Sequence, residues 1–346
     1  MVHIGINGFG RIGRLALRAA LLYYPDIHVG AVNTSDSMKL ADWAMLFKYD
    51  SVYGQFPASI RVESSDDPVK IGSLVVGETK IPFTAIKDPA LIPWREYGAE
   101  IILESTGVFR DSEKAKAHFV GGGTKVLISA PAKGDDIPFV IVGVNAREHK
   151  DKPILSNCSC TTYSVVPIAK TMLDHFPILK ASLTTIHAYT ADQQLVDGSH
   201  KKDIRRARAA ALNIVPTTSG SAQAVIKVLP ELSGKFEAFA IRVPVPVGSL
   251  SDLTFFLENE TTRDEVNKTL IETGQSSLKG ILDTTTYPIV SSDVIGTRAS
   301  AIVDLTMTQV IGGNLVKVFA WYDNEFSYAC RLLELAQTVN SYAVET

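Results

Sequence analysis

Short apolar runs alternate with segments of helical periodicity over the first half of the chain. The runs have the length of buried strands, and the segments place apolar residues three and four positions apart. Strands that alternate with helices indicate a parallel sheet. The expected strands are residues 2–6, 27–32, 100–103, 125–128 and 139–144, and the expected helices include one that ends before Pro25 and those at 40–47 and 112–119.

The pattern becomes rich in strands after about residue 180. A turn at Gly312-Gly313-Asn314 predicts a hairpin, and Thr262 with Glu265 predicts a capping box that opens a helix over 263–273. The expected strands are residues 181–187, 236–243, 250–257, 301–309 and 315–322, and a last helix is expected from about 325 to 342. This half of the chain therefore predicts an α+β domain with a mainly antiparallel sheet.

Composition narrows the class of protein. The chain has 346 residues, 46% of them apolar and 21% charged, with a net charge of -3, as is ordinary for a globular enzyme. This charge gives no general reason to expect a nucleic-acid or membrane partner. The 3 cysteines are too few for a disulfide framework and favour a reducing compartment. No leader-like start and no membrane-spanning apolar run is found, so a cytoplasmic protein is expected.

The first strand runs into a glycine-rich turn. Gly8, Gly10 and Gly13 match the pattern G-x-G-x-x-G between a strand and a helix, which is the context of a dinucleotide-binding turn in a Rossmann-type domain. The alternative is a tight turn that binds nothing. The second strand ends at Asn33-Thr34 rather than at the usual acid for the ribose, and Asp36 nearby is either a substitute or a solvated loop residue.

A second candidate site is the stretch Ser156–Thr162. It follows an apolar run and precedes a helix-like segment over 163–175, which places Cys160 at or near a helix N-terminus. Unpaired backbone N–H groups and the helix dipole favour a thiolate there. The alternative is that Cys158 and Cys160 are buried thiols beside a Ser/Thr cap, because free cysteine is commonly buried.

Four further features carry candidate chemistry. His187 ends a strand, although a lone histidine is more often structural. The basic run from Ser199 to Arg208 is a surface run, an oligomer contact or an anion site, and the lack of interleaved aromatic residues argues against a nucleic-acid patch. Residues 217–220 resemble a phosphate nest before a helix, and Arg242 is a further cation. Each of these features alone is also compatible with capping or a surface position.

Together these stretches resemble the phosphorylating glyceraldehyde-3-phosphate dehydrogenases. The resemblance covers nearly the full length, in order and at compatible spacing. It is carried by residues 6–13, 48–51, 104–109, 128–133, 156–162, 187–190, 205–210, 227–232, 242–244 and 321–325.

The resemblance implies an NAD(P)-dependent oxidoreductase of glycolysis or gluconeogenesis. Cys160 would be the nucleophile that attacks the aldehyde of glyceraldehyde 3-phosphate, and His187 would accept the hydroxyl proton as hydride leaves. Inorganic phosphate would then cleave the Cys160 thioester to 1,3-bisphosphoglycerate. The residue types suit this chemistry, because a thiolate is a good nucleophile and imidazole exchanges protons near neutral pH.

The resemblance also implies binding residues, a domain division and an assembly. The dinucleotide domain would be residues 1–159 with a C-terminal helix at about 325–346, and the catalytic domain residues 160–324. A homotetramer is implied, and no metal is expected. The implied cofactor residues are Gly8, Gly10, Arg11, Ile12, Gly13, Thr34, Lys87, Ser129, Ser199 and Asn324. One anion pocket would use Ser159, Thr161, Ser219 and Gly220, and the other Thr190, Arg206 and Arg242, with Arg206 open to sharing.

Several positions depart from the family pattern. Cys158 stands for the usual alanine, Tyr163 for asparagine and Ser164 for a second cysteine. Thr34 and Ser199 replace residues that suit NAD, so NADP is expected to be used alongside NAD.

Two rival functions remain. One is erythrose-4-phosphate dehydrogenase, against which Arg206, Ser219 and residues 188–190 argue. The other is a non-catalytic binding role, which predicts that residues such as Cys160 and His187 would be replaced; they are present.

Overall fold

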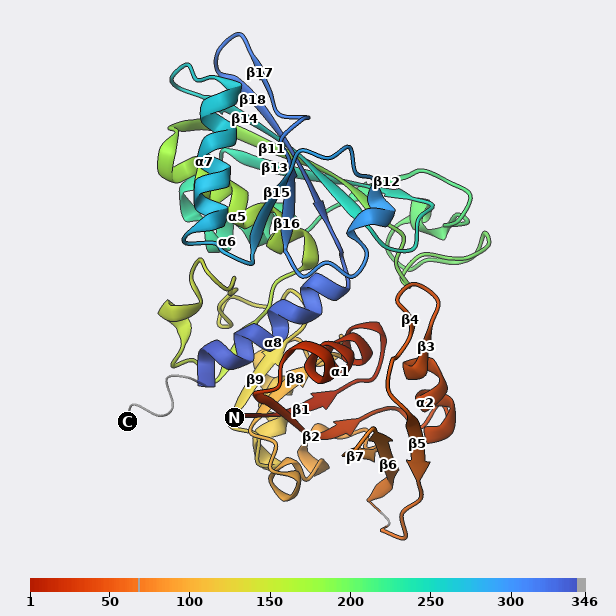
Figure 1. The fold of residues 1–346 in the computed structure, drawn as a ribbon. Helices are drawn as coiled ribbons and strands as arrows, with labels where there is room; N and C mark the ends of the chain where they lie inside the picture. Colours follow the sequence, from red (N-terminus) through yellow and green to blue (C-terminus); the bar gives the residue numbers. More distant parts are fainter. Residues whose placement is uncertain (68, 341–346) are drawn as a thin grey trace. The chain divides into compact units, whose positions relative to one another are not determined.

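The computed structural model describes residues 1–67 and 69–340. The chain divides into two compact units, of which the first combines Met1–Cys158 with the chain from Ala329 onward and the second is Ser159–Tyr328 (Figure 1). The predicted end of the C-terminal helix, beyond residue 340, lies outside the described residues.

The first unit contains a sheet with the strand order β10-β9-β8-β1-β2-β7-β6-β5. Neighbouring strands from β10 to β7 pair in parallel, as the sequence predicts, whereas β6 pairs antiparallel with both β7 and β5. The strands are β1 (Val2–Asn7), β2 (Ile27–Asn33), β5 (Ile60–Glu63), β6 (Lys70–Val76), β7 (Thr79–Thr84), β8 (Ile101–Glu104), β9 (Lys125–Ile128) and β10 (Ile154–Ser156).

Helices and short elements complete this unit. A core cluster that includes Ala31, Trp94, Ile102 and Val126 holds strands and connections together. The helices are α1 (Arg11–Tyr23), α2 (Leu40–Lys48), α3 (Ser112–Ala115), α4 (Ala117–Val120) and α8 (Phe326–Asn340), which begins in the second unit; the short elements are β3 (Tyr49–Asp50), β4 (Gly54–Gln55), η1 (Pro89–Leu91), η2 (Trp94–Tyr97) and η3 (Ala146–His149).

The strand predicted over residues 139–144 is wrong. Phe139 makes one isolated bridge to Ser156, and the chain then turns into η3. The side chain of Asn145 accepts the N–H of Ile141 at 2.8 Å and donates to the carbonyl of Phe139 at 2.9 Å. These local bonds satisfy backbone groups that a strand would have paired with a neighbour. The helix predicted over 112–119 is likewise divided into α3 and α4 at Lys116.

The second unit contains a sheet with the strand order β12-β13-β11-β14-β18-β16-β15, and β17 also pairs with β18. Most pairs are antiparallel, as the sequence predicts, while β11/β13 and β15/β16 are parallel. The strands are β11 (Ile178–Ala188), β12 (Val215–Thr218), β13 (Phe236–Val243), β14 (Ser249–Leu257), β15 (Leu282–Thr285), β16 (Ala301–Asp304), β17 (Gln309–Ile311) and β18 (Leu315–Tyr322).

The strand predicted over 301–309 is interrupted, because the Asp304 side chain accepts from the backbone and hydroxyl of Thr306 and stabilises a turn before β17. The hairpin from β17 to β18 and the Thr262–Glu265 capping box are both confirmed. Helices α5, α6 and α7 gather beside the sheet (Figure 1). The helices are α5 (Cys160–His175), α6 (Ser221–Val228) and α7 (Arg263–Gln275), with η4 (Ile204–Ala207), η5 (Pro230–Leu232) and η6 (Ser291–Val294).

Within the described ranges, no helix has both the length and the apolar character needed to cross a membrane.

The glycine-rich turn between β1 and α1 makes a testable contrast. A Cβ at Gly13 would lie 1.9 Å from the carbonyl oxygen of Gly8, whereas a Cβ at Gly10 would meet no atom within 4 Å. We expect Gly13→Ala to lower the free energy of unfolding by about 1–3 kcal/mol or more through overpacking. Gly10→Ala should unfold close to wild type. Thermal unfolding followed by circular dichroism measures both; equal midpoints for the two variants would contradict the packing argument.

Candidate functional site

The carboxyl end of the parallel sheet in the first unit carries a cleft of about 470 Å³. Gly8 and Gly10 line it after β1, Thr34 after β2, Lys87 after β7, and Ser105 after β8. Gly10 is the N-cap of α1 and offers no side-chain cap, so the first backbone N–H groups of the helix have no side-chain acceptor from that residue. A helix N-terminus of this kind binds phosphate groups.

Three side-chain atoms of cleft residues are buried without a hydrogen-bond partner among the described residues. They are the hydroxyl of Thr34, the indole nitrogen of Trp43 and the hydroxyl of Ser105. Buried polar groups are normally bonded, and leaving one unpaired costs about 1–3 kcal/mol. The cleft therefore fits a polar ligand better than an apolar one.

A buried chain of hydrogen bonds ties the strand ends beneath this cleft. The Asn33 amide donates to Asn7 at 2.8 Å, and the Asn7 amide donates to Glu104 at 2.6 Å. Glu104 also accepts the N–H of Thr106 at 2.8 Å. Sequence reasoning gave these residues no role, although a carboxylate that ends a buried strand is a visible signal.

The other predicted cofactor residues of this unit lie around the cleft rather than in its lining. Arg11 and Ile12 are in the first turn of α1, and Arg11 pairs with Asp50 at 2.6 Å. Ser129 follows β9, where its N–H donates to the carbonyl of Glu104 at 2.9 Å. Lys87, which does line the cleft, pairs with Asp36 at 3.1 Å, and both side chains are largely exposed.

In the second unit, Cys160 is the first residue of α5, which confirms the predicted helix N-terminus. Ser159 is the N-cap, and its hydroxyl accepts the N–H of Thr162 at 3.1 Å. The helix begins earlier than the apolar periodicity indicated, because the cap and first turn are polar. The Cys160 sulfur consequently lies where helix backbone dipoles stabilise negative charge.

His187, near the end of β11, lies beside this sulfur. The distance from Cys160 Sγ to His187 Nε2 is 3.4 Å, and the histidine is only 4% exposed. Burial and the nearby Arg242 lower the pKa of His187 to about 3. Burial raises the pKa of the Cys160 thiol, although Arg242 and Thr161 oppose that rise. At neutral pH this state of the site therefore holds a neutral imidazole beside a thiol.

Tyr322 at the end of β18 links α5 to β11 by hydrogen bonds. Its hydroxyl lies 3.0 Å from the Thr161 hydroxyl and 2.8 Å from the Thr185 hydroxyl. Its ring meets the His187 ring edge-on, with centroids 6.1 Å apart. Burial raises the pKa of Tyr322, so the phenol stays protonated. The sequence gave Tyr322 no role, because nothing in a linear pattern shows three strand and helix ends converging.

Thr190, Arg206 and Arg242 converge on a carboxylate that sequence reasoning missed. Arg206 donates to Asp192 at 2.6 Å, and the Thr190 hydroxyl donates to the same side chain. Arg242 donates to the Thr190 hydroxyl at 3.2 Å. Arg206 also donates to the Thr217 hydroxyl at 2.9 Å. Arg206 thus pairs with the half-exposed Asp192 and lies 3.8 Å from Asp203, whereas Arg242 is joined to Asp192 only through the Thr190 hydroxyl.

The residues predicted for the other anion pocket make local contacts. Gly220 is the N-cap of α6, and the Ser219 hydroxyl accepts the N–H of Ser221 at 3.1 Å. Arg206 reaches this segment by donating to the carbonyl of Thr218 at 3.1 Å. The hydroxyls of Ser159 and Thr161 are engaged by Thr162 and Tyr322, as described above.

The two remaining predicted cofactor residues belong to the second unit. Asn324 is buried, and its side-chain oxygen accepts from the N–H of Gly248 at 3.1 Å and the hydroxyl of Ser249 at 2.9 Å. These bonds fix the orientation of the amide, so its nitrogen is the atom that can donate a hydrogen bond to a ligand. Ser199 is exposed, and its carbonyl accepts from Gln194 at 3.0 Å.

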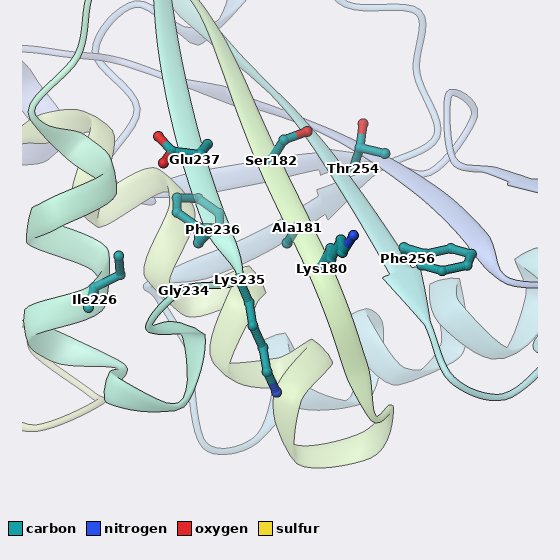
Figure 2. A pocket seen from close by; sticks show the side chains of 10 residues that line it. All are labelled: Lys180, Ala181, Ser182, Ile226, Gly234, Lys235, Phe236, Glu237, Thr254 and Phe256. Atoms are coloured by element: carbon teal, nitrogen blue, oxygen red, sulfur yellow. The ribbon is translucent and has the colours of Figure 1, made fainter.

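A separate cavity of about 450 Å³ lies where α6 meets the ends of β11, β13 and β14 (Figure 2). Lys180, Lys235, Glu237 and Phe256 are among its lining, and none of the predicted site residues is. Residues 1–67 and 69–340 contain no group of three or more His, Cys, Asp or Glu that could hold a metal ion.

Comparison with known proteins relates both units to one family. The family model "Glyceraldehyde 3-phosphate dehydrogenase, NAD binding domain" matches residues 2–112, and the model for the C-terminal domain matches residues 159–324. Glyceraldehyde-3-phosphate dehydrogenase 1 of Streptomyces avermitilis is 46% identical over 98% of both chains. The enzyme of Mycolicibacterium smegmatis is 45% identical, again over 98% of both chains.

Proposed function

The chain belongs to the glyceraldehyde-3-phosphate dehydrogenase family, and we propose that its own reaction is the phosphorylating oxidation of glyceraldehyde 3-phosphate to 1,3-bisphosphoglycerate. The observation that carries the proposal is the pairing of Cys160 Sγ with His187 Nε2 at 3.4 Å, at the N-terminus of α5. A thiol at a helix N-terminus beside an imidazole is the arrangement that thioester chemistry needs.

The chain's residues divide the work of this reaction. Cys160 attacks the aldehyde carbon, and His187 Nε2 manages the proton of the resulting hydroxyl. The bound dinucleotide supplies the hydride acceptor. Loss of hydride leaves a thioester on Cys160, and inorganic phosphate then displaces the thiolate. Thr190, Arg206 and Arg242 hold the phosphate group of the substrate, and Ser219 and Gly220, with Ser159 and Thr161, serve the attacking phosphate.

The cleft of the first unit is the proposed dinucleotide site. Gly8, Gly10 and Gly13 let the pyrophosphate approach the N-terminus of α1, with Arg11 and Ile12 in the first turn and Ser129 at the edge. The Thr34 hydroxyl, which is buried and has no hydrogen-bond partner among the described residues, supports the proposal that a ligand binds at the end of β2. In the second unit, the oriented Asn324 amide is proposed to hold the nicotinamide carboxamide.

We also propose that NADP is used alongside NAD. Thr34 removes the carboxylate that would repel a 2′-phosphate, a repulsion of roughly 4 kcal/mol at about 4 Å and an effective dielectric of 20. Lys87 is the nearby cation, although its pair with Asp36 must open to reach a ligand. Ser199 is a further hydroxyl that could serve the same group.

Two further proposals concern the oligomeric state of the protein and its location in the cell. We propose a homotetramer, which the exposed apolar residues of the segment 195–214 support: Leu195, Val196, Ile204, Leu212 and Ile214 are 69–81% exposed. We also propose a cytoplasmic location, because none of the three cysteines forms a disulfide, as in a reducing compartment.

The first prediction tests the nucleophile. Cys160→Ser should abolish phosphate-dependent NADH formation from glyceraldehyde 3-phosphate while the protein still binds coenzyme, because a hydroxyl does not form the thiolate. Cys158→Ala is the matched control and should keep most activity, since Cys158 is fully buried. Steady-state rates and coenzyme fluorescence titration measure both effects. Normal turnover by Cys160→Ser would refute the assignment.

The second prediction concerns coenzyme choice. Thr34→Asp should lower the ratio of kcat/KM for NADP to that for NAD by at least about tenfold, because the new carboxylate repels the 2′-phosphate and binds the ribose hydroxyls. Thr34→Ser keeps the hydroxyl and should leave the ratio near wild type. A wild type that does not use NADP, or an unchanged ratio in Thr34→Asp, would be incompatible with dual use.

The third prediction concerns assembly. Leu212→Asp should weaken the tetramer, because it places a charge in an apolar contact. Val120→Asp in α4 is the control, since Val120 is 75% exposed but lies in the first unit. Sedimentation velocity at several protein concentrations distinguishes the species. Equal sedimentation of the two variants would exclude the segment 195–214 from the contact.

A further inference from the structure

The ring nitrogen Nδ1 of His187 lies within hydrogen-bond distance of two groups, one of which can only accept a hydrogen bond and the other only donate one. It lies 2.7 Å from the carbonyl oxygen of Ala188, which can only accept a hydrogen bond. It also lies 2.8 Å from Nη1 of Arg242, which can only donate. Nδ1 therefore cannot satisfy both: it carries a proton for Ala188, or it presents a lone pair to Arg242.

The choice at Nδ1 decides what Nε2 can do for Cys160. When Arg242 donates to Nδ1, the neutral ring carries its proton on Nε2 and cannot accept one from the sulfur 3.4 Å away. When Nδ1–H donates to Ala188, Nε2 presents its lone pair to the thiol. The thiol proton then passes to Nε2, which leaves a thiolate beside an imidazolium, with no net gain or loss of protons.

Arg242 is also joined to the proposed site of the substrate's phosphate. The same Nη1 donates to the Thr190 hydroxyl at 3.2 Å and to the Ala188 carbonyl at 3.1 Å. The Nε atom of Arg242 is buried and has no hydrogen-bond partner in the part of the chain that the structure describes. A guanidinium with an unsatisfied buried donor gains from an anion that accepts two bonds from it. An anion near Thr190 thus competes with His187 for the same side chain.

We propose that Arg242 is a positioning residue that couples the occupied phosphate pocket to the protonation of His187. In the empty pocket, Arg242 holds the ring in the form that cannot accept the Cys160 proton. The dianionic phosphate of the substrate draws the guanidinium towards Thr190, and Nδ1 turns to Ala188. The base therefore becomes competent when the correct substrate is bound. This inference rests on the proposed function and adds a regulation of the same site.

The other charged and titratable groups around His187 fit this coupling. Arg242 from β13 and Arg206 from η4 disfavour the imidazolium, whereas Asp192 after β11 favours it. Cys160 of α5 supplies the opposite charge when ionised, and Tyr322 of β18 stays protonated. An anion that neutralises the two arginines raises the pKa of His187, and this electrostatic change acts in the same direction as the turned ring.

The test is the rate at which Cys160 reacts with iodoacetamide, an uncharged reagent that does not compete for an anion site. The wild-type enzyme is titrated with sodium sulfate at constant ionic strength, and modification of Cys160 is followed by mass spectrometry across the neutral pH range. Sulfate should accelerate the reaction by at least about threefold, since thiolate is the reactive form. Inorganic phosphate, tested in parallel, should act in the same way.

The opposite result overturns the proposal. If the anion only neutralised Arg242, it would raise the pKa of the Cys160 thiol and slow the reaction, so a slower or unchanged rate in wild type refutes the coupling. Arg242→Gln should remove the response to sulfate, and Arg205→Gln, which removes an exposed cation of the same segment, should keep it. A full response in Arg242→Gln would show that another residue provides the link.

Failure of the coupling is distinguishable from failure of the proposed function. An enzyme that turns over glyceraldehyde 3-phosphate through Cys160 but shows no sulfate response has the proposed function without this control.

Discussion

The contact between Cys160 and His187 depends on one crossing of secondary structure, where the N-terminus of α5 meets the end of β11. The Tyr322 hydroxyl fixes that crossing by bridging Thr161 on the helix to Thr185 on the strand. Both partners are buried, so the bridge is protected from competing water. If it were lost, buried hydroxyls on both elements would be unpaired, and the sulfur and the imidazole would no longer be held at 3.4 Å.

Charge distribution sets the chemical state of this pair. Burial together with the field of Arg242 and Arg206 keeps His187 neutral, against the opposing charge of Asp192. The same two guanidinium groups are suitable donors for a phosphate group. The same arginines thus have two roles. They attract an anionic substrate, and they disfavour protonation of the His187 imidazole until that anion binds.

The sequence predicts those parts of the molecule that are encoded locally. Apolar runs locate the central parallel strands, and polar capping residues locate the start of α5. Long-range convergence is not encoded in any local window: Tyr322 meets Thr161 across 161 positions of the chain. Residues 139–144 are apolar enough for a strand. The Asn145 side chain, however, forms hydrogen bonds with the Ile141 N–H and the Phe139 carbonyl, which a strand would have paired with a neighbouring strand. The strands β5, β6 and β7 were not predicted either: β5 has no buried position, and the five consecutive buried positions of β6 show no alternation.

Surroundings rather than residue type separate the two cysteines of the Ser156–Thr162 stretch. Cys158 has a φ of 53°, and its buried sulfur lies 3.6 Å from the carbonyl of Val140. A backbone carbonyl and an apolar enclosure disfavour a thiolate. Cys160, two residues later, is partly exposed and begins a helix, with an arginine near enough to oppose the rise that burial causes in its pKa. The left-handed turn at Cys158 therefore directs one thiol into the interior, where it is inert, and the next residues then enter the helix whose N-terminus makes the other one reactive.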